Sequence, residues 1–113
     1  MVVTGRDMGD VRVIEIGSAR IDAAGAVQFK EAVQTQLRGH EGRVVMDLSA
    51  VGFLDSSGLG ALVAVMKMLG GRPLELVGCA GPVRKVLTLT RMDRVFRLHD
   101  DVAAALARGR DAA

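Results

Sequence analysis

The feature that most constrains this chain is a regular alternation of short apolar runs with helix-like segments. The runs are Val11–Ile16, Arg43–Leu48, Leu74–Cys79 and Val95–Leu98, and each is followed by a stretch with helical periodicity. Strands that alternate with helices pair in parallel through right-handed crossovers. The pattern therefore predicts a single α/β domain with a mixed, mostly parallel sheet of about five strands and about four helices.

A turn signal near the N-terminus adds an antiparallel strand. Gly9 and Asp10 separate Val2–Thr4 from Val11–Ile16, and Gly and Asp are residues that tight hairpin turns favour. Helices are expected at Ala24–Arg38, Ser57–Gly70, Pro82–Thr90 and Asp100–Arg108. Because 113 residues suit one domain, we expect it to fill residues 1–109, with 110–113 as a short C-terminal tail.

The first of these helices has the clearest pattern. Its apolar side chains recur at spacings of three and four, as on the buried stripe of an amphipathic helix. The stripe consists of Ala26, Phe29, Val33 and Leu37. Asp22 is suited to cap the start of this helix, and Gly39 is suited to end it.

The charge balance and the few aromatic residues argue against a nucleic-acid binder. The chain has 15 basic and 13 acidic residues, and its three aromatic residues are all Phe. The chain therefore has only a small basic excess and few residues on which a base could stack. Cys79 is the only cysteine, which excludes an internal disulfide, and its apolar neighbours predict a buried, unreactive thiol.

The apolar segments are too short to predict a membrane-spanning helix or a signal peptide. The longest, Leu59–Leu69, is about half the length that spans a bilayer, and it contains Lys67. A helix this apolar is either buried on all sides or offers an apolar patch to a partner. Arg6 and Asp7 stand where a signal peptide would be apolar. We therefore expect a cytoplasmic protein without membrane insertion.

The most informative segment is Asp55–Gly60, with the sequence DSSGLG, which follows a predicted strand and opens a predicted helix. One interpretation is that Ser56 or Ser57 caps this helix. Another is that Ser57 accepts a phosphate, because the N–H groups and dipole at a helix start stabilise an anion. Such a group would add roughly −1.5 to −2 charges at one exposed point.

From Val44 to Gly60 the sequence VVMDLSAVGFLDSSGLG resembles the signature of STAS domains, the anti-sigma factor antagonists and their relatives in sulfate transporters. The segment Arg20–Ala24 also resembles the usual family pattern before the first helix. Order of elements and length agree across nearly the whole chain. The resemblance implies a STAS-like domain close to the stand-alone bacterial antagonists.

The resemblance also implies a mechanism. In such antagonists the second serine of the motif, here Ser57, is phosphorylated by an anti-sigma factor that is a serine kinase of the histidine-kinase-like ATPase type. The unphosphorylated antagonist sequesters this kinase and frees the sigma factor, and a serine phosphatase reverses the modification. The contact with the kinase is then expected at Asp22, Asp55, Ser56, Gly58, Leu59 and Gly60. The protein needs no cofactor, since ATP and Mg²⁺ belong to the kinase.

The family resemblance leaves a second role open. Some STAS domains are accessory subunits of a lipid-transport ATPase complex or of a stress-signalling assembly. In those proteins the motif serine is a contact and not a switch.

Enzyme-like interpretations fit less well. A nucleophile elbow needs glycines two residues before and after the serine, where Asp55 and Leu59 stand. Only His40 and His99 could serve as a base, and we expect both in solvated loops. Asp47 could mimic the phosphoryl-accepting aspartate of a receiver domain, but no acidic pair follows the first strand. We expect Asp47 to fix the following loop, and the protein not to be an enzyme.

Overall fold

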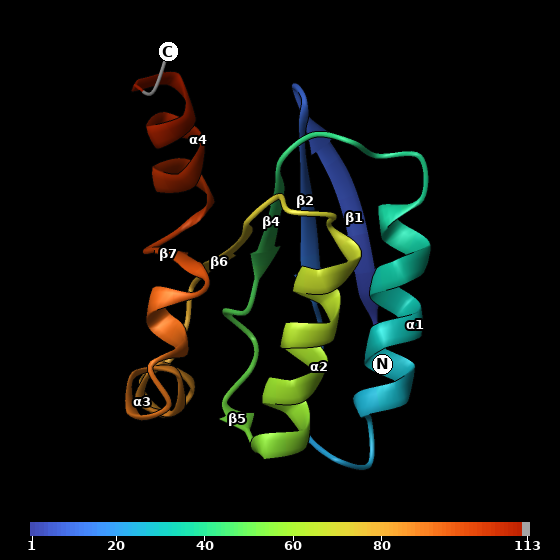
Figure 1. Cartoon of the computed structure of the whole chain (residues 1–113), viewed down its shortest axis with the longest axis vertical. Coiled ribbons are helices and arrows are strands. Elements are labelled where there is room, and N and C mark those ends of the chain that lie inside the picture. Colours follow the sequence, from blue (N-terminus) through green and yellow to red (C-terminus); the bar gives the residue numbers. More distant parts are fainter. Residues whose placement is uncertain (112–113) are drawn as a thin grey trace.

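The computed structural model describes residues 1–111, of which 109–111 by their backbone alone (Figure 1). The strands are β1 (Val3–Met8), β2 (Val11–Ile16), β3 (Arg20–Ile21), β4 (Val44–Asp47), β5 (Phe53–Leu54), β6 (Leu74–Val77) and β7 (Arg97–His99). The helices are α1 (Ala26–Leu37), α2 (Ser56–Met68), α3 (Gly81–Leu89), the short 3-10 helix η1 (Met92–Arg94) and α4 (Val102–Asp111).

Five strands form one mixed sheet in the order β1-β2-β4-β6-β7. Strands β2, β4, β6 and β7 are parallel, and β1 is antiparallel to β2. Gly9 and Asp10 form the predicted hairpin turn between Met8 and Val11, with Gly9 at a φ of 65°, which glycine adopts without strain. This architecture confirms the predicted α/β domain with its mostly parallel sheet and four helices.

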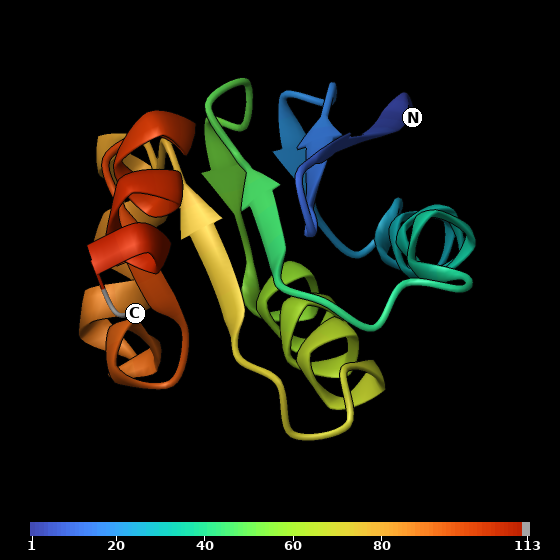
Figure 2. The same ribbon diagram turned by 90° about the horizontal axis from the view of Figure 1, so that it is seen from above.

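Helices cover both faces of the sheet, and each face carries its own apolar cluster. On one face, α1, α2 and α3 pack against residues such as Ile14 and Met46, and Phe29 of the predicted stripe is buried there. On the other face, α4 places Ala105 against Val45. Figure 2 shows α1 and α2 together on one side of β2 and β4, whereas α4 lies beyond β6.

The start of α1 differs from the prediction that Asp22 caps it. The N-cap is Gly25, which contributes no side-chain hydrogen bond. Asp22 lies one turn earlier, where its Oδ1 and its carbonyl oxygen accept from the Gly25 N–H at 3.3 and 3.1 Å. The prediction was wrong because residues 22–25 form a separate turn that engages Asp22. Gly39 follows the end of α1 with a φ of 71°, as predicted.

A second, two-stranded sheet escaped the sequence analysis. Strands β3 and β5 pair in parallel, with Arg20 opposite Phe53 and Ile21 opposite Leu54. Periodicity cannot indicate strands of two residues, because alternation needs at least four. Ile21 and Leu54 are buried, so this small sheet closes the core beside the start of α2.

The last helix is longer than predicted, since α4 continues past Arg108 to Asp111. The predicted tail, 110–113, therefore begins inside this helix, and residues 112–113 lie outside the described residues. The domain boundary at residue 109 stays a prediction. Within residues 1–111, no helix combines the length and the apolar character needed to cross a membrane.

Candidate functional site

Asp55, and neither serine, caps α2. Its Oδ1 accepts from the backbone N–H of Gly58 at 2.8 Å, and its carbonyl oxygen accepts from the N–H of Leu59 at 2.9 Å. The interpretation of Ser56 or Ser57 as the N-cap was therefore wrong, because the carboxylate one position earlier satisfies the first-turn donor. Both serines are exposed in the first turn of α2, and the cap needs neither hydroxyl.

The same carboxylate joins two loops that are distant in sequence. Oδ2 of Asp55 accepts from the backbone N–H of Ala23 at 3.2 Å, and the N–H of Asp55 donates to the carbonyl oxygen of Ile21 at 3.4 Å. The loop that carries Asp22 therefore lies against the first turn of α2. The structure thus brings together the two segments expected to form the site, which we call the serine site (Asp22, Asp55, Ser56, Ser57 and Gly58).

The two glycines of the motif have different roles. A Cβ atom on Gly58 would overlap the carbonyl oxygen of Ile21 and lie 2.8 Å from Cδ1 of Leu54, so packing requires glycine there. Gly60 is exposed, and a Cβ there would meet nothing within 4 Å. It follows Ser57 by three residues, on the same side of the helix. Gly60 therefore leaves an open surface beside the serine.

The rest of α2 contributes mainly to the core. Its apolar sequence therefore reflects burial, and not an apolar patch offered to a partner. The buried residues are Gly58, Ala61, Leu62 and Val65. Leu59, Val63 and Met66 are partly buried against the same cluster. Met68, near the end of α2 away from Ser57, is the large apolar residue that this helix exposes.

An ion pair and a cation–π contact lie beside the serine site, and the sequence analysis missed both. Arg20 donates from Nε to Oδ2 of Asp22 at 3.1 Å, and its guanidinium lies 4.1 Å from the ring centroid of Phe53. The hydrogen bond from Arg20 holds the pKa of the Asp22 carboxyl below its usual value. The sequence does not reveal these contacts, because each of the two strands has only two residues. One residue of each strand is buried, Ile21 or Leu54, and this is too short an alternation to recognise.

A second polar group of residues lies within the sheet, and we call Arg43, Glu75 and His99 the Glu75 cluster. Arg43 donates from Nε and Nη2 to the two oxygens of Glu75 at 2.9 and 2.6 Å. His99 Nε2 lies 2.9 Å from Oε1 of Glu75, which is only 2% exposed. Burial acts to raise the pKa of Glu75, but the hydrogen bonds from Arg43 and His99 outweigh it and lower the pKa.

The Glu75 cluster corrects the prediction for His99. This residue lies in β7 with a nearly buried side chain, not in a solvated loop. The prediction was wrong because its partner, Glu75, is on the neighbouring strand, 24 residues earlier. Arg43 Nη2 also donates to the carbonyl oxygen of Ala105 at 2.9 Å, which ties α4 to the sheet. A glutamate inside an apolar strand was the available signal, because a buried charge needs a partner.

Two other residues singled out by the sequence have structural roles. Oδ1 of Asp47 accepts from the backbone N–H of Ser49 at 2.9 Å, which confirms that Asp47 fixes the loop after β4. Cys79 is partly buried, and burial raises the pKa of its thiol, which disfavours the reactive thiolate. Among the described residues, no group of three His, Cys, Asp or Glu side chains could hold a metal ion.

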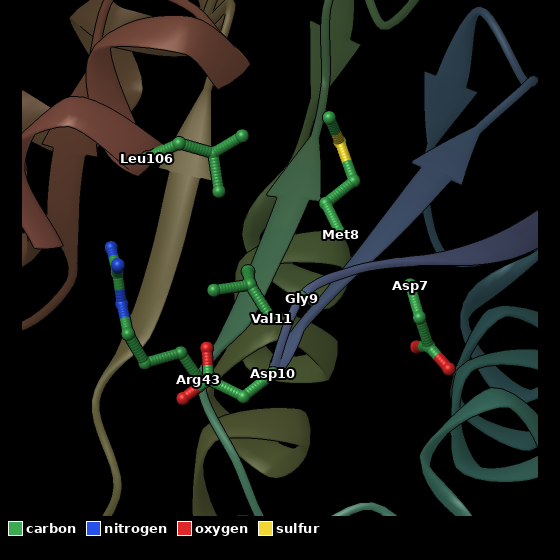
Figure 3. A pocket seen from close by; sticks show the side chains of 7 residues that line it. All are labelled: Asp7, Met8, Gly9, Asp10, Val11, Arg43 and Leu106. Atoms are coloured by element: carbon green, nitrogen blue, oxygen red, sulfur yellow. The ribbon is translucent and has the colours of Figure 1, made fainter. Parts of the chain in front are cut away.

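A cleft of about 630 Å³ lies between the hairpin turn and α4 (Figure 3). Residues of the hairpin, together with Leu106 of α4 and Arg43, line this cleft; the hairpin residues are Asp7, Met8, Gly9, Asp10 and Val11. This cleft is at the amino ends of β2 and β4, and Ser57 follows the carboxyl end of β4. The serine site is thus a surface built from the Asp22 loop and the first turn of α2, separate from this cleft.

The chain is similar to known proteins over most of its length. The family model described as STAS domain matches residues 6–105, which include both loops of the serine site. The anti-sigma-F factor antagonist RsfB of Mycobacterium tuberculosis is 35% identical over 107 residues, covering 94% of this chain and 87% of RsfB. An anti-sigma F factor antagonist of Paenibacillus polymyxa is 28% identical over 82 residues, covering 71% of this chain and 68% of that protein. The crystal structure of an anti-sigma factor antagonist from Mycobacterium paratuberculosis has a TM-score of 0.83 at 29% identity, covering 96% of this chain and 93% of that one.

Proposed function

The chain belongs to the STAS domain family, and on this premise we propose that it is an anti-sigma factor antagonist whose partner binding is controlled at Ser57. In this proposal the unphosphorylated protein binds an anti-sigma factor that is a serine kinase of the histidine-kinase-like ATPase type. That kinase, with its own ATP and Mg²⁺, phosphorylates Ser57 and so releases the antagonist, and a serine phosphatase restores it. The protein controls a sigma factor indirectly in the cytoplasm and binds no nucleic acid.

The observation that carries this proposal is the exposed Ser57 in the first turn of α2. Because Asp55 caps the helix, a phosphate on the Ser57 oxygen would leave the cap intact. Backbone N–H groups and the helix dipole at this position stabilise negative charge. A kinase can therefore modify the residue without unfolding the domain.

The phosphate would change the charge of the contact surface. It adds roughly −1.5 to −2 charges at neutral pH. The carboxylates of Asp55 and Asp22 already have partners, so a phosphate would add net negative charge to this surface. A partner surface shaped for a neutral hydroxyl then meets a dianion, and this repulsion drives release.

Three baits in lysate of the native cells test the proposal: wild type, Ser57→Asp and Thr88→Asp. Thr88 is exposed on α3 and controls for the added charge. Wild type and Thr88→Asp should retain the serine kinase, identified by mass spectrometry, and Ser57→Asp should retain at least about tenfold less. Equal retention of one transport ATPase or stress-signalling assembly by all three baits would contradict the proposal and favour an accessory subunit.

Incubation with the purified kinase, ATP and Mg²⁺ tests the position of the phosphate. Peptide mass spectrometry should locate one phosphate on Ser57. Ser57→Ala should remain unmodified and still bind the kinase. A phosphate found on Ser56 or any other residue would overturn the assignment of Ser57.

A further inference from the structure

The small sheet beside Ser57 presents a stacked pair of exposed side chains, Arg20 and Phe53. The two residues lie directly opposite each other in the pairing of β3 with β5. Their neighbours Ile21 and Leu54 point into the core and are 0% and 4% exposed. Because side chains alternate along a strand, Arg20 and Phe53 must point outward. The buried neighbours fix the backbone beneath them, so the pair has a rigid support.

Fold stability does not account for this exposure. Phe53 is 39% exposed, and the side chain of Arg20 is 59% exposed. Full burial of a Phe side chain stabilises a fold more than an exposed cation–π contact does. Aromatic residues and arginine are enriched at the centres of protein interfaces. The position and chemistry of this pair are therefore those of an interface anchor.

The guanidinium of Arg20 is held ready for a further acceptor. It lies over the Phe53 ring and donates from Nε to Asp22. Within the part of the chain whose side chains are described, Asp22 is the only acceptor that this guanidinium engages. Nη1 and Nη2 are thus left for an external group. Since the ring and Asp22 already hold the side chain, binding there loses little conformational entropy.

We propose that Arg20 and Phe53 select the partner that docks at Ser57, and that the docking surface of this partner carries a carboxylate beside an apolar side chain. This inference rests on the proposed function. A guanidinium binds a carboxylate through two parallel hydrogen bonds, which a lysine cannot reproduce. The uncovered part of the Phe53 ring supplies the apolar contact.

An acidic partner surface also explains how a phosphate on Ser57 would weaken partner binding. The first turn of α2 contains no acidic side chain, the charge of Asp22 is balanced by Arg20, and the Asp55 carboxylate at the N-cap accepts from two backbone N–H groups. A partner carboxylate can therefore approach the unmodified serine site without strong repulsion. After phosphorylation the same carboxylate meets a dianion in the contact surface. The same partner carboxylate would then bind Arg20 and be repelled by a phosphate on Ser57.

The experiment measures, by titration calorimetry, the affinity of the kinase retained by the wild-type bait for four purified variants. Arg20→Ala and Phe53→Leu each remove one half of the pair, and Arg20→Lys keeps the charge without the planar fork. Arg94→Ala changes an exposed arginine of η1 and is the matched control. Arg20→Ala should raise Kd at least about tenfold, Arg20→Lys and Phe53→Leu about threefold or more, and Arg94→Ala less than about twofold. Arg20→Ala should also reduce the salt dependence of Kd, while thermal unfolding remains that of wild type.

Each outcome has one meaning. If Arg20→Ala binds as wild type does and Ser57→Asp still loses the kinase, the inference is wrong and the proposed function stands. If Ser57→Asp binds as tightly as wild type, the proposed function fails and the inference fails with it. Weaker binding of Arg20→Ala with an unchanged salt dependence would overturn the carboxylate as the partner group.

Discussion

The serine site and the Glu75 cluster both depend on one carboxylate, but they use it in opposite ways. Asp55 accepts from two backbone N–H groups, those of Gly58 and Ala23, at 2.8 and 3.2 Å. Glu75 accepts from two side chains, those of Arg43 and His99. Asp55 lies partly exposed where two loops meet, whereas Glu75 is buried within the sheet.

This difference separates a surface that can be modified from an interior that must stay intact. Backbone N–H groups that donate to Asp55 fix the geometry of the serine site, so the serine side chains are not needed to maintain its structure. A buried carboxylate paired by side chains is stable only while both partners remain, and here the arginine also holds α4 through Ala105. We therefore expect changes in the Glu75 cluster to alter stability alone, and changes in the serine site to alter partner binding as well.

Glu75→Gln should have the largest effect on stability. The substitution leaves Arg43 facing a neutral amide, and removal of one partner from a buried ion pair costs about 3–5 kcal/mol. Because Arg43 keeps some access to water, we expect the lower end, a loss of about 3 kcal/mol in the free energy of unfolding by urea. Glu15→Gln is the matched control, exposed on the same face of the sheet, and should change stability by less than about 0.5 kcal/mol.

The same variant tests the direction of the Glu75 pKa shift. Because folding lowers this pKa, its stabilisation is complete above the ordinary glutamate pKa of about 4.3 and is lost as the pH falls below it. Wild type should therefore lose stability below about pH 4.3 more steeply than Glu75→Gln. Asp7 and Asp22 also have lowered pKa values, but they are present in both proteins and cancel in the difference. Equal slopes would show that folding does not favour the ionised form of Glu75.

The two glycines of the motif, Gly58 and Gly60, give the next largest effect, with opposite signs. Gly58→Ala places a methyl group against the Ile21 carbonyl, and overpacking of this kind costs about 1–3 kcal/mol. Gly60→Ala meets open space in a helix interior and should stabilise the protein by about 0.5–1 kcal/mol while weakening kinase binding. Thermal unfolding and calorimetry measure both. Full stability of Gly58→Ala would mean that packing against Ile21 does not fix the loop.

Much of the fold could be predicted because its main elements carry local signals. Strand β2 spans the predicted residues, Val11–Ile16, and the apolar stripe of α1 is in the core. The two-residue strands β3 and β5 depend on each other, and no local period reveals such a pair. A local sequence pattern thus predicts an element that buries a regular apolar face of its own. It does not predict a strand that is defined only by its pairing with another strand.

The same limit applies to the candidate site. The motif and Asp22 were identified from the sequence, and the structure brings their loops together through Asp55. The roles within the motif were not predictable, because capping by Asp55 depends on its extended backbone, which aims the carboxylate at the Gly58 N–H. Arg20 with Phe53, and Glu75 with its partners, are contacts between strands, which one sequence does not reveal.

The smallest loss of stability should come from the caps of two helices, α2 at the serine site and α4, which Arg43 of the Glu75 cluster ties to the sheet. Asp55 caps α2, and Asp101, directly before α4, accepts from the N–H of Ala104 at the same distance of 2.8 Å. Substitution of a capping residue by Ala costs about 1 kcal/mol. Asp101→Ala should therefore lose about 1 kcal/mol in the free energy of unfolding, measured by urea denaturation, and Asp55→Ala about 0.5–1.5 kcal/mol more, because it also loses the bond from the Ala23 N–H.

The two cap variants should differ in kinase binding, and this difference is the sharpest test of the comparison. Asp55→Ala also breaks the bond to Ala23, so the loop of Asp22 is no longer tied to the helix that carries Ser57. We expect its Kd to rise about tenfold, whereas Asp101→Ala, which also loses a helix cap, should stay within about twofold of wild type. If both variants weakened binding equally, overall stability would control the interaction, and Asp55 would have no special part in joining the two loops.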